Sequence, residues 1–191
     1  MRGKIFIRLI AVAACASFAA SAWSQDMGAT DLDAYLREGG FSAPNAPEGE
    51  RKRLVAIYDQ GVAAHKNKQY DRAILAFTSL LQTNPEARIA AVLYVARSQS
   101  YIGKQELKKA VADAAQAIRL DRTLVVAYNT RGVAFGRMGD FKNAIQDFDA
   151  ALRLDPRFID AQKNRALAER YLKTRNPDTK RATKGPVKPK E

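Results

Sequence analysis

Residues 125–158 have the sequence VVAYNTRGVAFGRMGDFKNAIQDFDAALRLDPRF, and this stretch decides the fold of the chain. Its first half spaces side chains at i, i+3, i+4 and i+7, which puts them on one face of a helix, at Tyr128, Arg131, Gly132 and Phe135. Its second half uses the same periodicity on another helix, at Ala144, Phe148 and Ala151. The stretch therefore predicts two successive amphipathic helices.

Turn signals separate and end these helices. Gly139 tolerates the left-handed conformation, and the side chain of Asp140 can accept hydrogen bonds from free N–H groups at the start of the next helix. Asp155-Pro156 ends the second helix, because the residue before a proline avoids helical angles. We therefore expect a helical hairpin.

Small residues occur where the two helices of this hairpin would cross. Gly132 and Ala144 let the helix axes approach toward the short end of the usual range of roughly 8–10 Å. Phe135 and Phe148 then fill the space beside the contact. We expect enlargement of Gly132 or Ala144 to cost about 1–3 kcal/mol through overpacking.

Two weaker copies of the pattern precede this hairpin. Moving back 34 residues gives Tyr94, Ser98, Tyr101, Ala110, Ala114, Ala117 and Arg122. Moving back a further 37 gives Ile57, Gly61, Ala64, Ala73, Phe77, Leu80 and Pro85, which places three extra residues in the connection near Glu86 to Ala90. Because one hairpin cannot bury its apolar face, about three stacked copies are the practical minimum for such a fold.

These residues resemble the tetratricopeptide repeat, with its aromatic, Leu-Gly, Tyr, Ala, Phe, Ala and Pro pattern. Arg131 stands where the pattern usually has leucine. The resemblance implies an all-α fold, an α-solenoid of three helix-turn-helix repeats at about 54–87, 91–124 and 125–158, followed by a capping helix at 159–173. The residues expected to pack the repeats are Gly61, Ala73, Phe77, Tyr94, Tyr101, Ala110, Tyr128, Gly132, Phe135, Ala144, Phe148, Ala151 and Pro156.

The N-terminal residues 1–24 are predicted to be a secretory signal peptide. Arg2, Lys4 and Arg8 precede an apolar run, and small residues follow it at a cleavage site. An uncleaved membrane anchor is one alternative, although the apolar run is short for a span of about 20 residues. Lipidation of Cys15 is another, because residues 12–15 resemble a lipobox. We therefore expect an exported, periplasmic protein.

The segments that flank the repeats differ in character. In residues 25–53 we expect a short helix from Leu32 to Glu38 and then a linker with prolines and glycines. Residues 174–191 carry many Lys and Arg residues and almost no apolar ones, which predicts a disordered basic tail. The formal net charge of +12 favours anionic partners in general, so the tail can make weak contacts with anionic surfaces.

Catalytic and metal-binding patterns are not evident in the sequence. His65 is the only histidine and Cys15 the only cysteine, which leaves too few residues for a nucleophile–histidine set or a metal site. The sequence also lacks a phosphate-cradling glycine loop. We therefore expect no enzyme activity, no metal and no cofactor.

The resemblance also implies where a partner would bind. In that family the first helices of successive hairpins line a concave groove that accepts peptides or helices. Projection onto this surface gives Tyr58, Val62, His65, Val92, Val95, Gln99, Ile102, Val126, Asn129, Val133 and Arg137. The positions that grip a C-terminal carboxylate in some members here hold Tyr58, Val62, Ala96, Val126 and Thr130, so we expect an apolar ligand face and no carboxylate clamp.

These observations favour a non-catalytic adaptor that binds a peptide or helix of another protein of the cell envelope. The alternative is a structural protein of the envelope that self-associates through its repeat ends into a homo-oligomer, with the groove occupied. The N-terminal segment or a second copy would then cover the groove. Nucleic-acid binding through the basic tail is a third hypothesis, and a weaker one. It would need stacking aromatics beside a basic stripe, whereas the aromatics here are used in hairpin packing.

Overall fold

The structure is a computed structural model that describes residues 47–175. Over these residues the chain forms only helices: α3 (Glu48–Lys66), α4 (Tyr70–Gln82), α5 (Ala87–Gly103), α6 (Leu107–Leu120), α7 (Val125–Met138), α8 (Phe141–Leu154) and α9 (Ile159–Arg175). The predicted signal peptide, the predicted helix at 32–38 and residues 176–191 of the basic tail lie outside the described residues.

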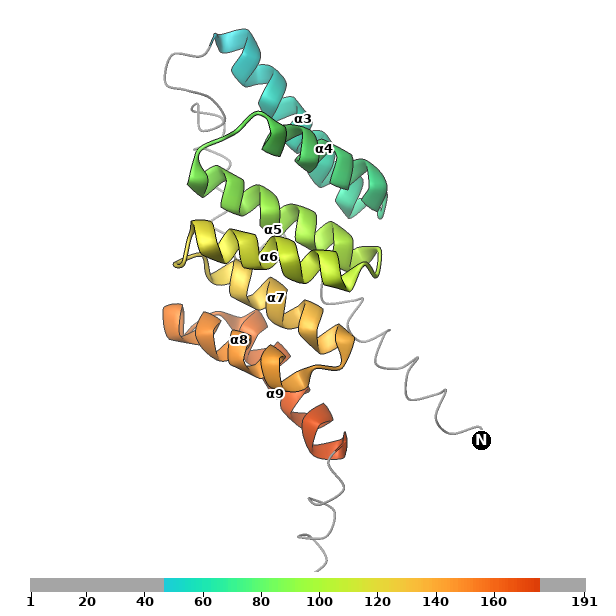
Figure 1. The fold of residues 1–191 in the computed structure, drawn as a ribbon, viewed down its shortest axis with the longest axis vertical. Helices are drawn as coiled ribbons and strands as arrows, with labels where there is room; N and C mark the ends of the chain where they lie inside the picture. Colours follow the sequence, from blue (N-terminus) through green and yellow to red (C-terminus); the bar gives the residue numbers. More distant parts are fainter. Residues whose placement is uncertain (1–46, 176–191) are drawn as a thin grey trace, which may run out of the picture.

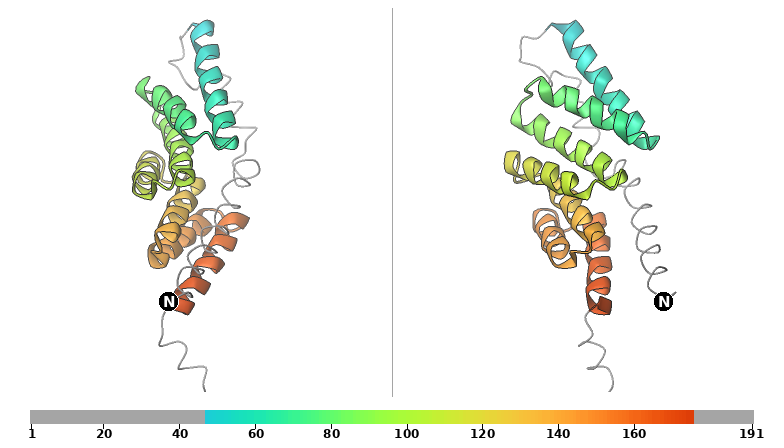
Figure 2. Two further views of the ribbon diagram at one scale, coloured as in Figure 1. Left: turned by 90° about the vertical axis from the view of Figure 1, so that its right-hand side faces the viewer. Right: turned by 45° about the vertical axis from the view of Figure 1, so that its right-hand side comes forward.

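The described helices form a stack of hairpins, as predicted. The pairs α3/α4, α5/α6 and α7/α8 are each packed internally, each packs on the next pair, and α9 packs on α8 at the end (Figure 1). Figure 2 shows a curved stack in which α3 and α9 lie toward the same side of the molecule. We call the surface of α3, α5, α7 and α9 on that side the inner-helix face. The prediction of an all-α solenoid is thus confirmed.

Three helix boundaries correct the sequence-based ones. α3 begins at Glu48, so residues 48–53 are helical and do not belong to the linker. α5 begins at Ala87, four residues before the expected start of its repeat at residue 91, so the extra residues add a helical turn and do not lengthen a loop. α9 continues to Arg175, two residues past the expected end of the cap. Apolar contacts explain the second difference, because Ile89 and Ala90 are buried in the added turn.

The helices of the first and third hairpins approach closely at a glycine. A Cβ atom on Gly132 would lie 2.6 Å from Cε1 of Phe148 and 3.1 Å from the carbonyl oxygen of Ala144. A Cβ atom on Gly61 would lie 2.8 Å from Cε1 of Phe77. Both phenylalanine rings are almost wholly buried, so neither can move aside without disturbing the core.

The middle hairpin has a serine at this crossing. The Ser98 hydroxyl is buried and donates a hydrogen bond of 2.7 Å to the carbonyl oxygen of Ala110 on the facing helix. The middle copy also has Ala114 where the other hairpins have Phe77 and Phe148, so a serine at the crossing does not face a bulky ring at that position. The polar group of Ser98 remains satisfied inside the core.

The predicted turn between α7 and α8 is present. Gly139 has a φ of 81° in the left-handed region, and the Asp140 side chain accepts a hydrogen bond from the backbone N–H of Asn143. After α8, Asp155 adopts an extended conformation and its side chain accepts a hydrogen bond from the N–H of Arg157. Asp121 makes the same kind of turn after α6. These turns fix the length of each hairpin.

An arginine–aspartate pair joins the two helices within the second hairpin, and another joins the two helices within the third. Arg97 binds Asp113 through two hydrogen bonds of 2.7 and 2.9 Å, and Arg131 binds Asp147 through two of 2.8 and 2.7 Å. Each pair is mostly shielded from solvent, and the hydrogen bonds to the carboxylates raise the pKa of both guanidinium groups. Such bidentate geometry is strong and directional. The pairs therefore hold the two helices of a hairpin in register.

Sequence reasoning missed these pairs, although a signal for them exists. Arg97 and Arg131 are 34 residues apart, and so are Asp113 and Asp147. A repeated opposite-charge couple at the repeat period identifies an interaction within each copy. The first hairpin lacks the couple, since the positions 37 residues before Arg97 and Asp113 hold Gln60 and Ala76.

The helix crossing predicts opposite effects for two neighbouring glycine substitutions. Gly132→Ala should lower the free energy of unfolding by about 1–3 kcal/mol, because its methyl group overlaps Phe148 and Ala144. Gly136→Ala should leave stability unchanged or raise it by up to about 1 kcal/mol, because its Cβ atom meets only the Ala144 Cβ at 3.8 Å and alanine favours the helix. Urea denaturation followed by circular dichroism measures both values. Equal effects of the two substitutions would contradict the close crossing.

The shielded ion pair predicts a second contrast. Asp147→Asn should lower the free energy of unfolding by about 1–3 kcal/mol, because it leaves the Arg131 charge without its carboxylate in a partly buried place. Asp149→Asn removes the partner of Arg165 in a more exposed pair and should cost about 0–1 kcal/mol. The double variant Arg131→Leu with Asp147→Leu should regain most of the loss, because both charges leave together. The same denaturation series checks all three variants, and a large loss from Asp149→Asn alone would refute this assignment.

Candidate functional site

The inner-helix face is built by first helices that lie side by side. α5 packs against α7, and α7 packs against α9. Three polar contacts join neighbouring first helices: His65 Nδ1 lies 2.9 Å from Ser100 Oγ, Arg137 donates to the Ile102 carbonyl at 3.3 Å, and Asn164 donates to the Asn129 side chain at 3.0 Å. The residues of each contact are 35 apart in the sequence. These contacts set the order of the helices across the face.

The structure brings the predicted groove residues together on these helices, but it buries most of them. The buried ones are Tyr58, His65, Val92, Val95, Gln99, Ile102, Val126 and Asn129, while Val62, Val133 and Arg137 are half-buried. Val95 and Val126 belong to one apolar cluster with Ala127 and Phe158, and Ile102 belongs to another with Ala134. The apolar face expected from the sequence is therefore mostly closed to solvent, because Val95, Val126 and Ile102 pack the first helices against one another.

A polar atom on this face has no hydrogen bond among the described residues. The Oε1 atom of Gln99 is buried and accepts no hydrogen bond there. Its helix, α5, lies between α3 and α7 in the stack (Figure 1). Since a buried acceptor without a donor costs free energy, an atom of this kind is a place where a ligand N–H group can bind.

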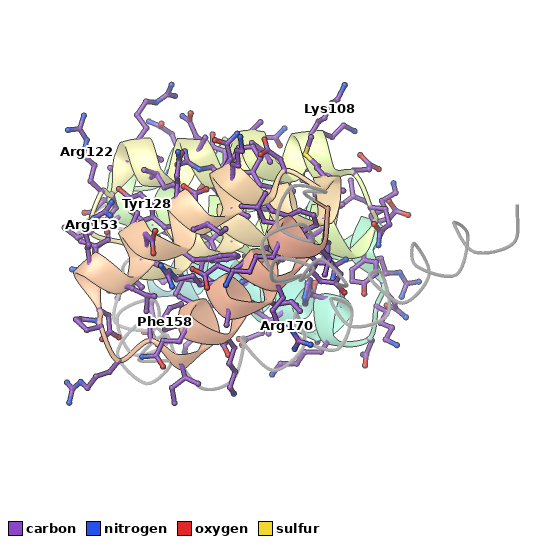
Figure 3. The ribbon with its side chains drawn as sticks, turned by 90° about the horizontal axis from the view of Figure 1, so that it is seen from below. Lys108, Arg122, Tyr128, Arg153, Phe158 and Arg170 are labelled. Carbon is purple, nitrogen blue, oxygen red and sulfur yellow. The ribbon has the colours of Figure 1, made fainter. Side chains whose placement is uncertain are left out.

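The last helix adds positive charge to the face. Lys163, Leu167 and Arg170 share one side of α9 at the spacing i, i+4, i+7. Lys163 and Arg170 are exposed, and Leu167 is half-buried. Figure 3 shows Arg170 on the opposite side of the molecule from Lys108 of α6. The face thus combines half-buried apolar side chains with basic groups at its C-terminal end.

His65 has a structural place on this face. It is buried against Tyr70, whose ring centroid lies 5.6 Å from that of the imidazole in an edge-on arrangement. The Ser100 hydroxyl donates to the Ala96 carbonyl, so it accepts from Nδ1–H of His65. Burial lowers the pKa of His65 to about 4, so the imidazole is neutral at neutral pH. A neutral, hydrogen-bonded histidine in this setting joins α3 to α5.

The described residues offer neither a metal site nor a membrane-spanning helix. Within residues 47–175, no three His, Cys, Asp or Glu side chains come together in a way that would hold a metal ion. None of the described helices is long and apolar enough to cross a lipid bilayer.

Comparisons with known proteins place the fold. Tetratricopeptide repeat models match residues 91–124 and 125–158. No curated protein matches the sequence.

Solved structures with similar folds include tetratricopeptide domains. The Arabidopsis OM64 domain is 27% identical, with a TM-score of 0.56, and the match covers 62% of this chain and 96% of that one. The second domain of human RPAP3, solved with the HSP70 peptide SGPTIEEVD, is 29% identical with the same TM-score and coverage. The Sgt2 domain from Aspergillus fumigatus, 20% identical with a TM-score of 0.60 over 73% of this chain and 89% of that one, shows similarity of fold alone.

The two matched segments are the second and third hairpins, whereas the first hairpin has Ile57 and Ala64 in place of the helix-A aromatics. The first hairpin nevertheless packs as the third one does, with Gly61 against Phe77. Together, the fold and the two matched segments show that this chain carries tetratricopeptide repeats within an all-α solenoid.

Proposed function

We propose that the protein is a non-catalytic periplasmic adaptor that binds a segment of another envelope protein across its inner-helix face. The coarser part of this proposal, a protein-interaction module, is supported by the similar RPAP3 domain, which was solved with a bound peptide. The finer part concerns this chain's own residues and its location.

The observation that carries the proposal is the Gln99 acceptor in its setting. Gln99 Oε1 is buried without a hydrogen bond in the described structure. Val62 of α3 and Val133 of α7 are half-buried on the helices to either side. A peptide segment laid across these helices would bury the valine side chains further and donate a hydrogen bond to Gln99. Apolar burial then supplies most of the affinity, and the polar contact supplies orientation.

The charges on the face indicate what kind of segment it would take. Lys163 and Arg170 lie on α9 at the C-terminal end of the stack, which favours acidic residues at the corresponding end of the partner. The family positions that grip a terminal carboxylate hold apolar or neutral residues here, including Ala96 and Thr130. We therefore propose an internal segment as the ligand, recognised by apolar anchors and flanking acidic residues.

The periplasmic location rests on residues 1–24 alone. A basic start, an apolar run and small residues are the features of a secretory signal. Mass spectrometry of the protein recovered from its native envelope would give the N-terminus. A start just after Ala22 or Ser24 supports cleavage, whereas a lipid-modified Cys15 at the N-terminus would replace this location by a membrane-anchored one.

Photo-crosslinking tests the binding face. A benzoyl-phenylalanine residue at position 163 or 170 should capture a segment of another envelope protein, and the same residue at position 108 or 142 should not. All four positions hold exposed basic side chains, so each variant loses one positive charge at an exposed position. The variants differ in location, because positions 163 and 170 lie on the inner-helix face and positions 108 and 142 lie on second helices. Equal capture at all four positions, or none at 163 and 170, would refute the proposal. Capture of a second copy of this chain would favour the self-assembly alternative.

The variant Gln99→Leu separates binding from folding. Leucine has no acceptor to satisfy, so we expect the free energy of unfolding to stay level or to rise. The yield of the crosslink at position 163 should nevertheless fall, because the partner loses its hydrogen bond. An unchanged yield would show that Gln99 plays no part in recognition.

A further inference from the structure

We infer that residues 31–41 of this same chain occupy the inner-helix face when no partner is bound there. The inference concerns the same face as the proposed function and adds an intramolecular competitor for it.

The segment has the pattern of a short amphipathic helix. Leu32, Tyr35 and Leu36 are spaced i, i+3, i+4, so they share one side of a helix that Asp31 can cap and Gly39-Gly40 would end. A helix of about two turns is not stable alone in water. Its apolar side therefore needs a surface to bury against.

The inner-helix face lies within reach of this segment. Eight residues, 39–46, separate the helical part of the segment, residues 31–38, from Pro47 at the start of α3, and they span at most roughly 28 Å when extended. From the start of α3, the middle of the face lies about half the length of α3 away along the helix axis, or roughly 14 Å, and one or two helix spacings of roughly 10 Å away along the stack. The linker is thus long enough to place the segment over α5 and α7.

The charges of the two surfaces are complementary. Residues 25–46 contain four acidic groups and one basic group. The inner-helix face has Arg137 on α7 and Lys163 and Arg170 on α9. Attraction between these surfaces favours docking of the acidic segment toward the C-terminal end of the stack. A tethered segment of this length has an effective concentration in the millimolar range, so even a weak contact is substantially occupied.

The apolar part of the face suits the segment as well. Val62, Val133 and Leu167 are half-buried on α3, α7 and α9, and an apolar helix side laid over them would cover them further. Gln99 Oε1 lies on the intervening helix and would accept a hydrogen bond from the segment. A partner that binds the same face must then displace residues 31–41, which makes the segment a built-in competitor.

Paramagnetic relaxation enhancement on residues 25–191 tests this inference. This chain has no cysteine, because Cys15 is the only one in the sequence, so Ala34→Cys carries a single spin label. We expect the amide signals of Gln99, Val133 and Leu167 to lose intensity, and those of the exposed outer residues Leu75 and Lys108 to keep it. A label at Ala182→Cys in the tail serves as the matched control and should not give this pattern.

Two further samples decide between occupants. Leu32→Asp with Leu36→Asp in the labelled chain should restore the lost intensities. A mixture of labelled chains without ¹⁵N and unlabelled chains with ¹⁵N should show no loss, because the contact is within one molecule. Loss in the mixture, loss that survives the double substitution, or no loss at all would overturn the inference. If the relaxation experiment shows no docked segment but the crosslinker at position 163 still captures a partner, the inference fails and the proposed function stands. If the segment is docked but no partner is captured, only the proposed function is contradicted.

Discussion

The close approach of paired helices at a small side chain is the constraint on which the rest of the structure depends. At Gly132 a single added carbon would overlap a buried ring and a backbone carbonyl. The same position holds Gly61 in the first hairpin and Ser98 in the second. The two helices of each hairpin pack closely at this point. Together they form a surface against which the next hairpin packs, and repetition of this contact gives the stack.

Stacking in turn creates the surface that can bind. The first helices come side by side and share polar contacts, such as the one between Asn129 and Asn164. The buried Val95 and Val126 pack between these helices, so they stabilise the solenoid directly beneath its inner-helix face. Substitutions at Val95 or Val126 would therefore alter folding and binding together, and the exposed Lys163 and Arg170 are better probes of binding.

The sequence predicted the fold well because its signals are local. The hairpin at 125–158 follows from helical spacing, from Gly139 and from the proline after Asp155, and each of these acts within a few residues. The sequence predicts a connection where α5 has its added turn. The reason is that Ile89 and Ala90 become core residues only when the hairpins are stacked. The burial of the face does not follow from local patterns for the same reason. The contacts that bury it join residues of neighbouring first helices, which are about one repeat apart in the sequence. The Arg–Asp pairs needed a comparison between copies, which the pattern of apolar residues does not provide.

The most direct test of this account is a nuclear Overhauser measurement at the crossing of α7 and α8. The account predicts strong cross-peaks from the Hα protons of Gly132 to the Phe148 ring, because an added Cβ would lie within 3 Å of that ring. It also predicts contacts between the side chains of Asn129 and Asn164, which lie on neighbouring first helices. Absence of the Gly132–Phe148 cross-peaks in the folded protein would mean that the helices do not meet at a small side chain, and the basis for the stack and its inner-helix face would be lost.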